Sequence, residues 1–206
     1  MDDKLTEMLR GNPALELFKN PRPRAEVEEV LGLGHIRIEL EDRDRIDKWR
    51  YECTCKFGYS IPCSEVVEAV VRDSPILDVG AGTGYWTKIL RDAGADVVAS
   101  DIHVWKNAKL VFGVEIKKMD AAKAIKVYPN RNVFMSWPSV HESWAAEAVK
   151  QIQPGRLLFY LGEWKGCTGD DELHEFLEEN FENGGGPAVP SWPCIHDSLY
   201  ILRRKS

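Results

Sequence analysis

A glycine-rich turn in the middle of the chain limits what this sequence can fold into more than any other feature. Residues 76–84 read Ile-Leu-Asp-Val-Gly-Ala-Gly-Thr-Gly, and helical spacing of apolar residues follows over 85–93. The apolar run predicts a buried strand. Glycine lets the turn adopt a positive φ and lets a ligand approach the backbone, while the next helix offers free N–H groups at its start. The segment therefore predicts a strand, a ligand-binding turn and a helix in succession.

Short apolar segments alternate with helical patterns along the rest of the chain. We expect strands over 96–100, 114–116, 132–136, 156–162 and 198–203, and helices over 105–112, 141–151 and 170–180. This alternation indicates βαβ units and a mainly parallel sheet, whose two buried faces explain strands that are apolar throughout. The last strand follows a stretch rich in glycine and proline at 184–193, which allows it to run antiparallel.

The first 70 residues have a different character. Residues 1–50 are highly charged and broken by prolines, and we expect helices over 13–19, 22–31 and 42–56, with another capped by Ser64. The chain is therefore divided into a helical N-terminal cap or lid over 1–70 and a core over 71–206. Residues 49–62 are the best candidate lid, because aromatic side chains gather there at Trp49, Tyr51, Phe57 and Tyr59.

Two common nucleotide-binding loops do not match the turn. The dinucleotide fingerprint Gly-x-Gly-x-x-Gly needs glycine at position 85, which is Tyr85, and the phosphate loop needs a Gly-Lys pair that is missing. The turn instead resembles motif I of class I S-adenosylmethionine-dependent methyltransferases. This resemblance implies a Rossmann-like α/β fold, with a seven-stranded, mostly parallel sheet and helices on both faces. It also implies S-adenosyl-L-methionine as the cofactor.

Two downstream acids strengthen the resemblance. In this family the turn wraps the methionine part of the cofactor, and the acid before it, here Asp78, contacts the amino-acid group. Asp101 lies 23 residues later, where the family holds the ribose hydroxyls, and a carboxylate can accept both hydrogen bonds of a diol. Asp120, 19 residues further on, matches the position that reads the adenine amino group. The implied cofactor-binding residues are Tyr59, Asp78, Gly80, Ala81, Gly82, Gly84, Trp86, Asp101, Ile102, Asp120, Ala121 and Ser136.

The resemblance covers residues of about 50–206. The runs 57–62, 80–86, 136–138, 162–170 and 195–200 are similar to a little-characterised group of microbial methyltransferase-like proteins. Residues 136–139, Ser-Trp-Pro-Ser, stand where amino-methyltransferases carry a polar residue, two prolines and an aromatic. Ser136 would be the polar member, but one proline is missing and Ser139 replaces the aromatic. The motif therefore leans towards a nitrogen acceptor without specifying one.

Three further residues complete the candidate catalytic set that begins with Ser136. Glu163 and Trp164 close the fifth strand at its carboxyl end, and Glu163 is suited to bind a substrate cation or to act as a base. His196 precedes the last strand and is a candidate base near neutral pH. The structural alternatives are a solvent-facing glutamate and a histidine bonded within its own loop.

Tryptophan is abundant, with seven residues in a chain of 206. Four of them fall at the expected carboxyl edge of the sheet: one after the glycine turn, two after the fourth and fifth strands, and one before the last strand. Such rings can stack on a flat ligand or surround a cation, although filling the core is the simpler role. We therefore expect an aromatic-lined acceptor pocket for a planar or amine-bearing molecule, formed by Trp86, Trp137, Trp164 and Trp192.

The composition narrows the cellular setting. The net charge is −6, so nucleic acid is an unlikely partner, and no apolar run reaches the ~18 residues that would span a membrane. Five cysteines without a secretory signal favour a cytoplasmic protein with free thiols. Cys53 and Cys55 lack a second close cysteine pair, so no metal is expected.

The sequence as a whole predicts a methyltransferase that acts on a small or medium acceptor. Three alternatives remain open: a protein or RNA methyltransferase, a non-catalytic S-adenosylmethionine-binding regulatory partner, and an aminopropyl transferase. The oligomeric state and the role of residues 1–50 are not specified by any motif.

Overall fold

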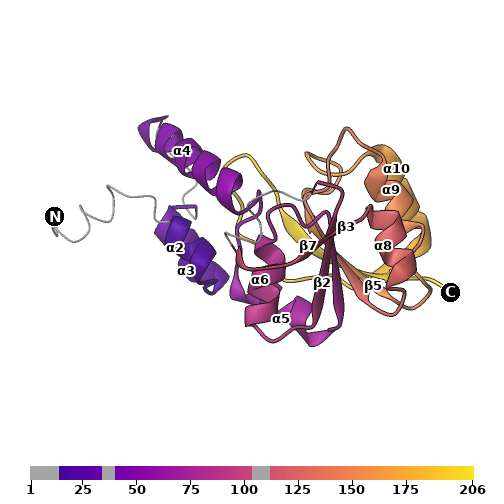
Figure 1. Ribbon diagram of the computed structural model, residues 1–206. Helices are drawn as coiled ribbons and strands as arrows, with labels where there is room; N and C mark the ends of the chain where they lie inside the picture. The colour runs from indigo at the N-terminus through magenta and orange to yellow at the C-terminus, as the bar shows by residue number, and fades with distance from the viewer. Residues whose placement is uncertain (1–13, 34–39, 104–111) are drawn as a thin grey trace.

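The computed structural model describes residues 14–33, 40–103 and 112–206. These residues form a seven-stranded sheet, around which the helices pack (Figure 1). The order of its strands is β3-β2-β1-β4-β5-β7-β6. Strands β1 to β5 pair in parallel, and β7 runs antiparallel to both β5 and β6. The predicted seven-stranded, mostly parallel sheet is therefore confirmed. The strands are β1 (Ile76–Val79), β2 (Val97–Asp101), β3 (Ile116–Lys118), β4 (Asn132–Ser136), β5 (Leu157–Gly162), β6 (Phe181–Asn183) and β7 (Ser198–Arg204).

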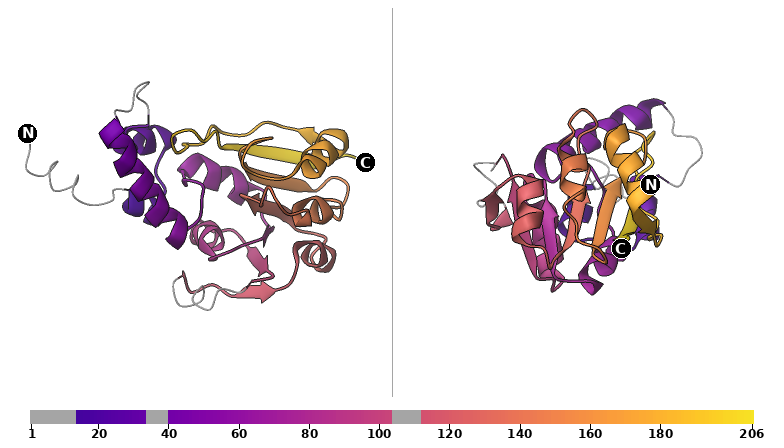
Figure 2. Two further views of the ribbon diagram at one scale, coloured as in Figure 1. Left: turned by 90° about the horizontal axis from the view of Figure 1, so that it is seen from above. Right: turned by 90° about the vertical axis from the view of Figure 1, so that its right-hand side faces the viewer.

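Helices cover both faces of the sheet, as the sequence predicts. On one face lie α8 (Ala121–Val127), α9 (Trp144–Val149) and α10 (Asp171–Asn180). On the other lie α5 (Ser64–Arg72) and α6 (Tyr85–Asp92). Figure 2 shows the N-terminal helices together beside α6 and away from α8 to α10. These helices are α2 (Ala14–Lys19), α3 (Arg24–Leu31) and α4 (Leu40–Lys56).

Buried strand residues alternate between the two faces, because successive side chains of a strand point in opposite directions. All six residues of β5 are buried. Phe159 and Leu161 join the core under α5 and α6, while Leu158 and Tyr160 join the core under α8 to α10. This double burial explains why the strands read as continuous apolar runs.

The N-terminal helices share the core of the α5–α6 face. Phe18 of α2 is fully buried and stacks on Phe57, with ring centroids 5.0 Å apart. The Tyr85 hydroxyl donates a 2.7 Å hydrogen bond to the backbone oxygen of Phe18. Helix α5 spans the boundary expected at residue 70, and the division into cap and core stays a prediction. No helix in the described ranges has the length and apolar character needed to cross a membrane.

Several details differ from the sequence-based expectations. The predicted cap at Ser64 is wrong: Cys63 is the N-cap of α5, and the Ser64 hydroxyl bonds the Glu65 carboxylate at 3.3 Å instead of a backbone amide. The third strand begins at Ile116 rather than 114. Helix α8 and strand β6 were not expected, since they are only seven and three residues long. The helix expected over 105–112 falls almost entirely outside the described residues.

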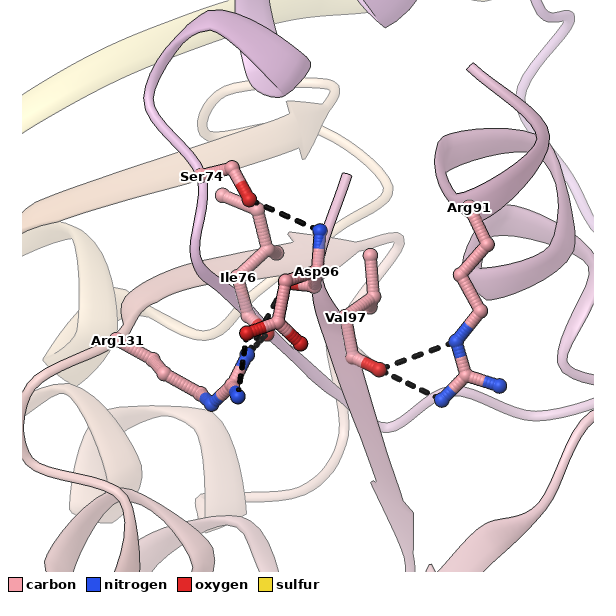
Figure 3. A network of polar contacts seen from close by, with 6 residues as sticks. All are labelled: Ser74, Ile76, Arg91, Asp96, Val97 and Arg131. Atoms are coloured by element: carbon pink, nitrogen blue, oxygen red, sulfur yellow. Dashed lines mark hydrogen bonds and ion pairs between the residues drawn. The ribbon is translucent and has the colours of Figure 1, made fainter. Parts of the chain in front are cut away.

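A polar network ties the amino ends of β1 and β2 together, at the edge opposite the glycine turn (Figure 3). The Arg131 guanidinium donates to the backbone oxygens of Ile76 and Asp96 at 3.2 and 3.0 Å and pairs with the Asp96 carboxylate at 2.8 Å. Arg91 donates to the backbone oxygen of Val97 at 2.6 and 3.1 Å. This network stabilises the sheet and leaves the carboxyl edge for the site.

Candidate functional site

Two cavities meet at the carboxyl edge of the sheet, and their linings share Gly80 and Trp137. This is the edge at which open parallel sheets bind ligands. The first, which we call the β2-side cavity, measures about 350 Å³ and includes Asp101 and Asp120 in its lining. The second, the α4-side cavity, measures about 370 Å³ and includes Asp78 and Ser136.

Asp101 fixes the glycine turn from the end of β2. One carboxylate oxygen accepts a 2.8 Å hydrogen bond from the Gly82 N–H, and the other accepts a 2.7 Å bond from the His103 N–H. The Ala81 N–H donates to the backbone oxygen of Ser100 at 3.1 Å. The turn is therefore held against β2 by both backbone and side chain.

Two glycines in the turn are required by their surroundings. Gly84 has φ +80°, and a Cβ placed there would come within 2.3 Å of Val114 Cγ2. Gly80 has φ +65°, and its Cβ would lie 2.9 Å from the Trp144 ring. Beside Gly82, in contrast, the nearest atom to such a Cβ is 4.0 Å away, so the backbone there is open to a ligand.

The β2-side cavity brings together the residues expected to hold an adenosine group. Ile102, which is half exposed to solvent, and Ala121, which is buried, both line this cavity. Asp120 is the N-cap of α8, where one carboxylate oxygen accepts a 2.8 Å bond from the Lys123 N–H. The sequence did not indicate that four further residues line this cavity; they are Met119, Ser139, Glu142 and Trp144.

The α4-side cavity contains a buried carboxyl group. Asp78 is 2% exposed and accepts a 2.5 Å hydrogen bond from the Thr87 hydroxyl. Burial, with a smaller contribution from the Asp101 charge, raises the pKa of Asp78 to about 7, while the hydrogen bond from Thr87 opposes this rise. The carboxyl group is therefore poised to gain or lose its proton near neutral pH.

A hydroxyl pair extends this lining to β4. The Trp86 indole N–H donates to Ser60 Oγ at 3.2 Å, and Ser60 Oγ lies 3.1 Å from Ser136 Oγ. Ser60 is fully buried, whereas Ser136 lines the cavity. Ser136 therefore lies beside the glycine turn, as its expected position after β4 requires.

An aromatic pair closes the α4-side cavity. Tyr59 and Trp137 stack with ring centroids 4.8 Å apart and an angle of 11° between the planes. Trp137 has φ 52°, a left-handed conformation that is uncommon for a bulky residue and costs about 1–3 kcal/mol. Phe57, Gly58, Thr54 and Cys55 also line this cavity, so α4 and the residues after it contribute to the site. Trp49 and Tyr51 of the expected lid line neither cavity.

Glu163, Trp164 and His196 lie outside the linings of both cavities. One Glu163 oxygen accepts bonds from the backbone N–H and the Nδ1 of His196, each at 3.0 Å, and the other accepts a 2.8 Å bond from the Cys167 N–H. Burial alone would raise the pKa of Glu163, but these bonds lower it to about 2. The His196 side chain is 84% exposed. Trp164 packs on Tyr160, His174 and Tyr200.

The four tryptophans of the expected acceptor pocket separate into two groups. Trp86 and Trp137 line the α4-side cavity. Trp192 is fully buried in the core, and its indole N–H donates to the backbone oxygen of Tyr59 at 3.1 Å. Trp164 belongs to the aromatic cluster beside α10. An aromatic wall is present, but it consists of Trp86, Trp137, Phe57 and Tyr59.

Comparison with known proteins gives similarity at the level of structure. No protein-family model matches the chain, and no curated protein sequence does. Magnesium protoporphyrin IX methyltransferase from Synechocystis PCC 6803, solved with bound S-adenosylmethionine, matches 84% of this chain over 87% of its own, with 15% identity and a TM-score of 0.50.

Two other solved structures illustrate the range of matches. A Burkholderia thailandensis 1,6-didemethyltoxoflavin-N1-methyltransferase is 16% identical, over 69% of this chain and 78% of its own, with a TM-score of 0.48. An rRNA methylase from Streptococcus thermophilus is 15% identical, over 68% of this chain and 92% of its own, with a TM-score of 0.43. The strand order β3-β2-β1-β4-β5-β7-β6 and the match to the Synechocystis enzyme show that this chain has the Rossmann-like fold of class I S-adenosylmethionine-dependent methyltransferases.

Proposed function

We propose that this protein is an S-adenosylmethionine-dependent methyltransferase acting on a small or medium acceptor. The observation that carries the proposal is the pair of cavities on either side of the glycine turn, which share Gly80 and Trp137. A cofactor with an adenosine at one end and an amino acid at the other requires such a two-part site. When bound, the cofactor would supply a methyl group on a positively charged sulfonium sulfur, and the neutral thioether S-adenosylhomocysteine would be the leaving group.

The β2-side cavity fits the adenosine end. Asp101 accepts one backbone N–H on each oxygen, and each oxygen keeps a second acceptor position for a ribose hydroxyl. Ile102 offers an exposed apolar surface for the flat base. Asp120 uses one oxygen to cap α8, which leaves the other for an amino group of the base.

The α4-side cavity fits the amino-acid end. Gly82 presents open backbone there, and Asp78 is a buried carboxyl that becomes an anion near neutral pH. An ammonium group beside Asp78 would favour the ionised form. This complementarity explains how a buried acid is useful in the site rather than merely costly.

The remaining part of the α4-side cavity is the proposed acceptor site. Ser136 supplies a hydroxyl that can accept a hydrogen bond from an amine, and Tyr59 and Trp137 supply a flat aromatic wall. These residues favour a planar nitrogen acceptor. No residue with the character of a strong base is among those that line this cavity in the described part of the chain, apart from Asp78. The chain would therefore act mainly by positioning the acceptor and excluding water.

Calorimetric titration with S-adenosylmethionine and S-adenosylhomocysteine tests the proposal. We expect saturable binding by the wild type and at least about tenfold weaker binding by Asp101→Asn, because a hydrogen bond to a charged group contributes about 1.5–3 kcal/mol. Asp171→Asn is the matched control, since Asp171 is an exposed aspartate at the start of α10, outside both linings. Equal binding by wild type and Asp101→Asn would show that the site is assigned incorrectly.

Turnover is a separate measurement. Release of S-adenosylhomocysteine is followed with a panel of planar amines, and activity with one of them supports the acceptor assignment. Cofactor binding without turnover on any acceptor would favour the non-catalytic regulatory alternative. None of the five cysteines, all of which lie in the described ranges, forms a disulfide in the structure. A cytoplasmic location stays a prediction from the sequence.

A further inference from the structure

Trp137 combines an uncommon backbone conformation with a ring in a defined place. Its φ of 52° follows directly on β4, and its backbone N–H donates to the oxygen of Leu161 in β5 at 2.8 Å. Trp137 lines both cavities, and its ring stacks on Tyr59. A bulky residue stays in this conformation only where surrounding contacts hold it.

The polar contact on the ring comes from the loop before β7. Asp197 is 5% exposed, and one of its carboxyl oxygens accepts a 2.9 Å hydrogen bond from the Trp137 indole N–H. The backbone oxygen of Asp197 accepts a 3.4 Å bond from the Ser191 hydroxyl, which ties the loop to itself. The second carboxyl oxygen is buried and has no hydrogen-bond partner among the described residues.

A carboxyl group is expensive at a buried position. Burial raises the pKa of Asp197 to about 7; the Trp137 bond opposes this rise, the Glu163 charge adds to it and Arg50 opposes it. An aliphatic side chain would fill the space without this cost but would leave the indole N–H without an acceptor. The hydrogen bond from the Trp137 indole N–H is therefore the contact for which a carboxyl group is needed at this position. The titratable groups that act on or are affected by Asp197 are Glu163 after β5, Arg50 of α4, Cys167 and Tyr160.

We propose that Asp197 is a positioning residue: it holds the Trp137 indole, and through that ring the Tyr59 stack, so that the wall between the two cavities is formed before any ligand binds. It touches neither cavity itself, because it is absent from both linings. Its effect on ligand binding rests on the proposed function, whereas its hold on the ring does not.

Proton–nitrogen NMR of the indole groups tests this hold without any ligand. The Trp137 signal is assigned as the one lost in Trp137→Phe. In wild type we expect it to move as the pH crosses about 7, when Asp197 loses its proton. Asp197→Asn keeps an acceptor, so the signal should stay near its wild-type position and no longer move. Asp197→Leu removes the acceptor, so the signal should shift upfield. The Trp192 signal, bonded to a backbone oxygen, is the internal control.

Binding of S-adenosylhomocysteine tests the consequence. We expect Asp197→Asn to bind within about twofold of wild type and Asp197→Leu to bind at least about tenfold more weakly, with matching circular dichroism spectra. A Trp137 signal unchanged in Asp197→Leu, or one that still titrates in Asp197→Asn, would overturn the proposal. So would wild-type affinity in Asp197→Leu. If the wild type binds no cofactor, the proposed function fails and the NMR result alone decides the role of Asp197.

Discussion

Single residues determine whether the glycine turn can form at all. Gly84 and Gly155 have nearly the same backbone angle, with φ of +80° and +81°. Their surroundings differ, because a Cβ on Gly84 would collide with Val114 while a Cβ on Gly155 meets nothing within 4 Å. The two positions therefore separate the cost of the backbone conformation from the cost of crowding.

Replacing each glycine by alanine should give unequal losses of stability. Gly155→Ala should lower the free energy of unfolding by about 1–2 kcal/mol, the cost of the left-handed backbone alone. Gly84→Ala should lower it by about 1–3 kcal/mol more, because its Cβ overpacks the site. Chemical denaturation of both variants measures the difference. In a Val114→Ala background the extra loss at Gly84 should shrink; if the two losses are equal in both backgrounds, Val114 moves aside freely and the packing argument is wrong.

Residue patterns in the sequence placed Asp101 and Asp120 together at the carboxyl edge, and both line one cavity, whereas Glu163 and His196 lie outside the linings of both cavities. Asp101 and Asp120 could be placed because each follows a short strand, and parallel strands end at a common edge. Glu163 and His196 also flank strand ends, but Glu163 is bonded to His196 and accepts a further hydrogen bond from the Cys167 backbone N–H. That arrangement depends on how residues 163–169 fold back, for which the sequence has no periodic signal.

At the scale of elements, Asp120 has two separable roles. Its carboxylate caps α8, and it also lines the β2-side cavity. Serine is a good N-cap but carries no charge, while alanine provides neither feature. Substitutions at this one position can therefore separate the effect of Asp120 on helix stability from its effect on ligand binding.

Asp120→Ser should keep the stability of the wild type and still weaken cofactor binding by about tenfold, the loss of one charged hydrogen bond. Asp120→Ala should weaken binding to a similar degree and in addition lose about 0.5–2 kcal/mol of stability. Calorimetry and thermal unfolding measure the two effects. If Asp120→Ser bound the cofactor with wild-type affinity, Asp120 would act only as the N-cap of α8.

Element boundaries show why some of the fold was not predictable. The strands β1 and β4 have the bounds that the sequence predicts. Helix α8 has seven residues and depends on its Asp120 cap, and β6 has three residues that are positioned by pairing with β7. Such short elements are stabilised by their neighbours rather than by their own sequence.

At the scale of the whole molecule, the site lies where the N-terminal helices meet the sheet. Residues of α4 and of the segment after it line the same cavity as the glycine turn and β4. Asp78 lines this cavity too, and its burial raises its pKa to about 7. If the cofactor binds as proposed, its affinity should therefore depend on whether Asp78 is protonated.

Cofactor affinity should rise with pH through neutrality. With a pKa of about 7, Asp78 is about one tenth ionised at pH 6 and about nine tenths at pH 8, so binding of a cationic amino-acid group should tighten about tenfold. Calorimetry with S-adenosylhomocysteine at pH 6, 7 and 8 measures this change. Asp78→Asn should bind S-adenosylhomocysteine weakly at every pH. If the affinity of that variant still rose with pH as in the wild type, the titrating group would be a residue other than Asp78.

The central claim is that one ligand spans the two cavities across Gly80 and Trp137. A crystal structure of the protein with S-adenosylhomocysteine tests it most directly. The account predicts the ribose at Asp101, the base against Ile102, the amino-acid group beside Asp78 and the sulfur facing Ser136. A ligand bound elsewhere, or one confined to a single cavity with the other left vacant, would contradict it.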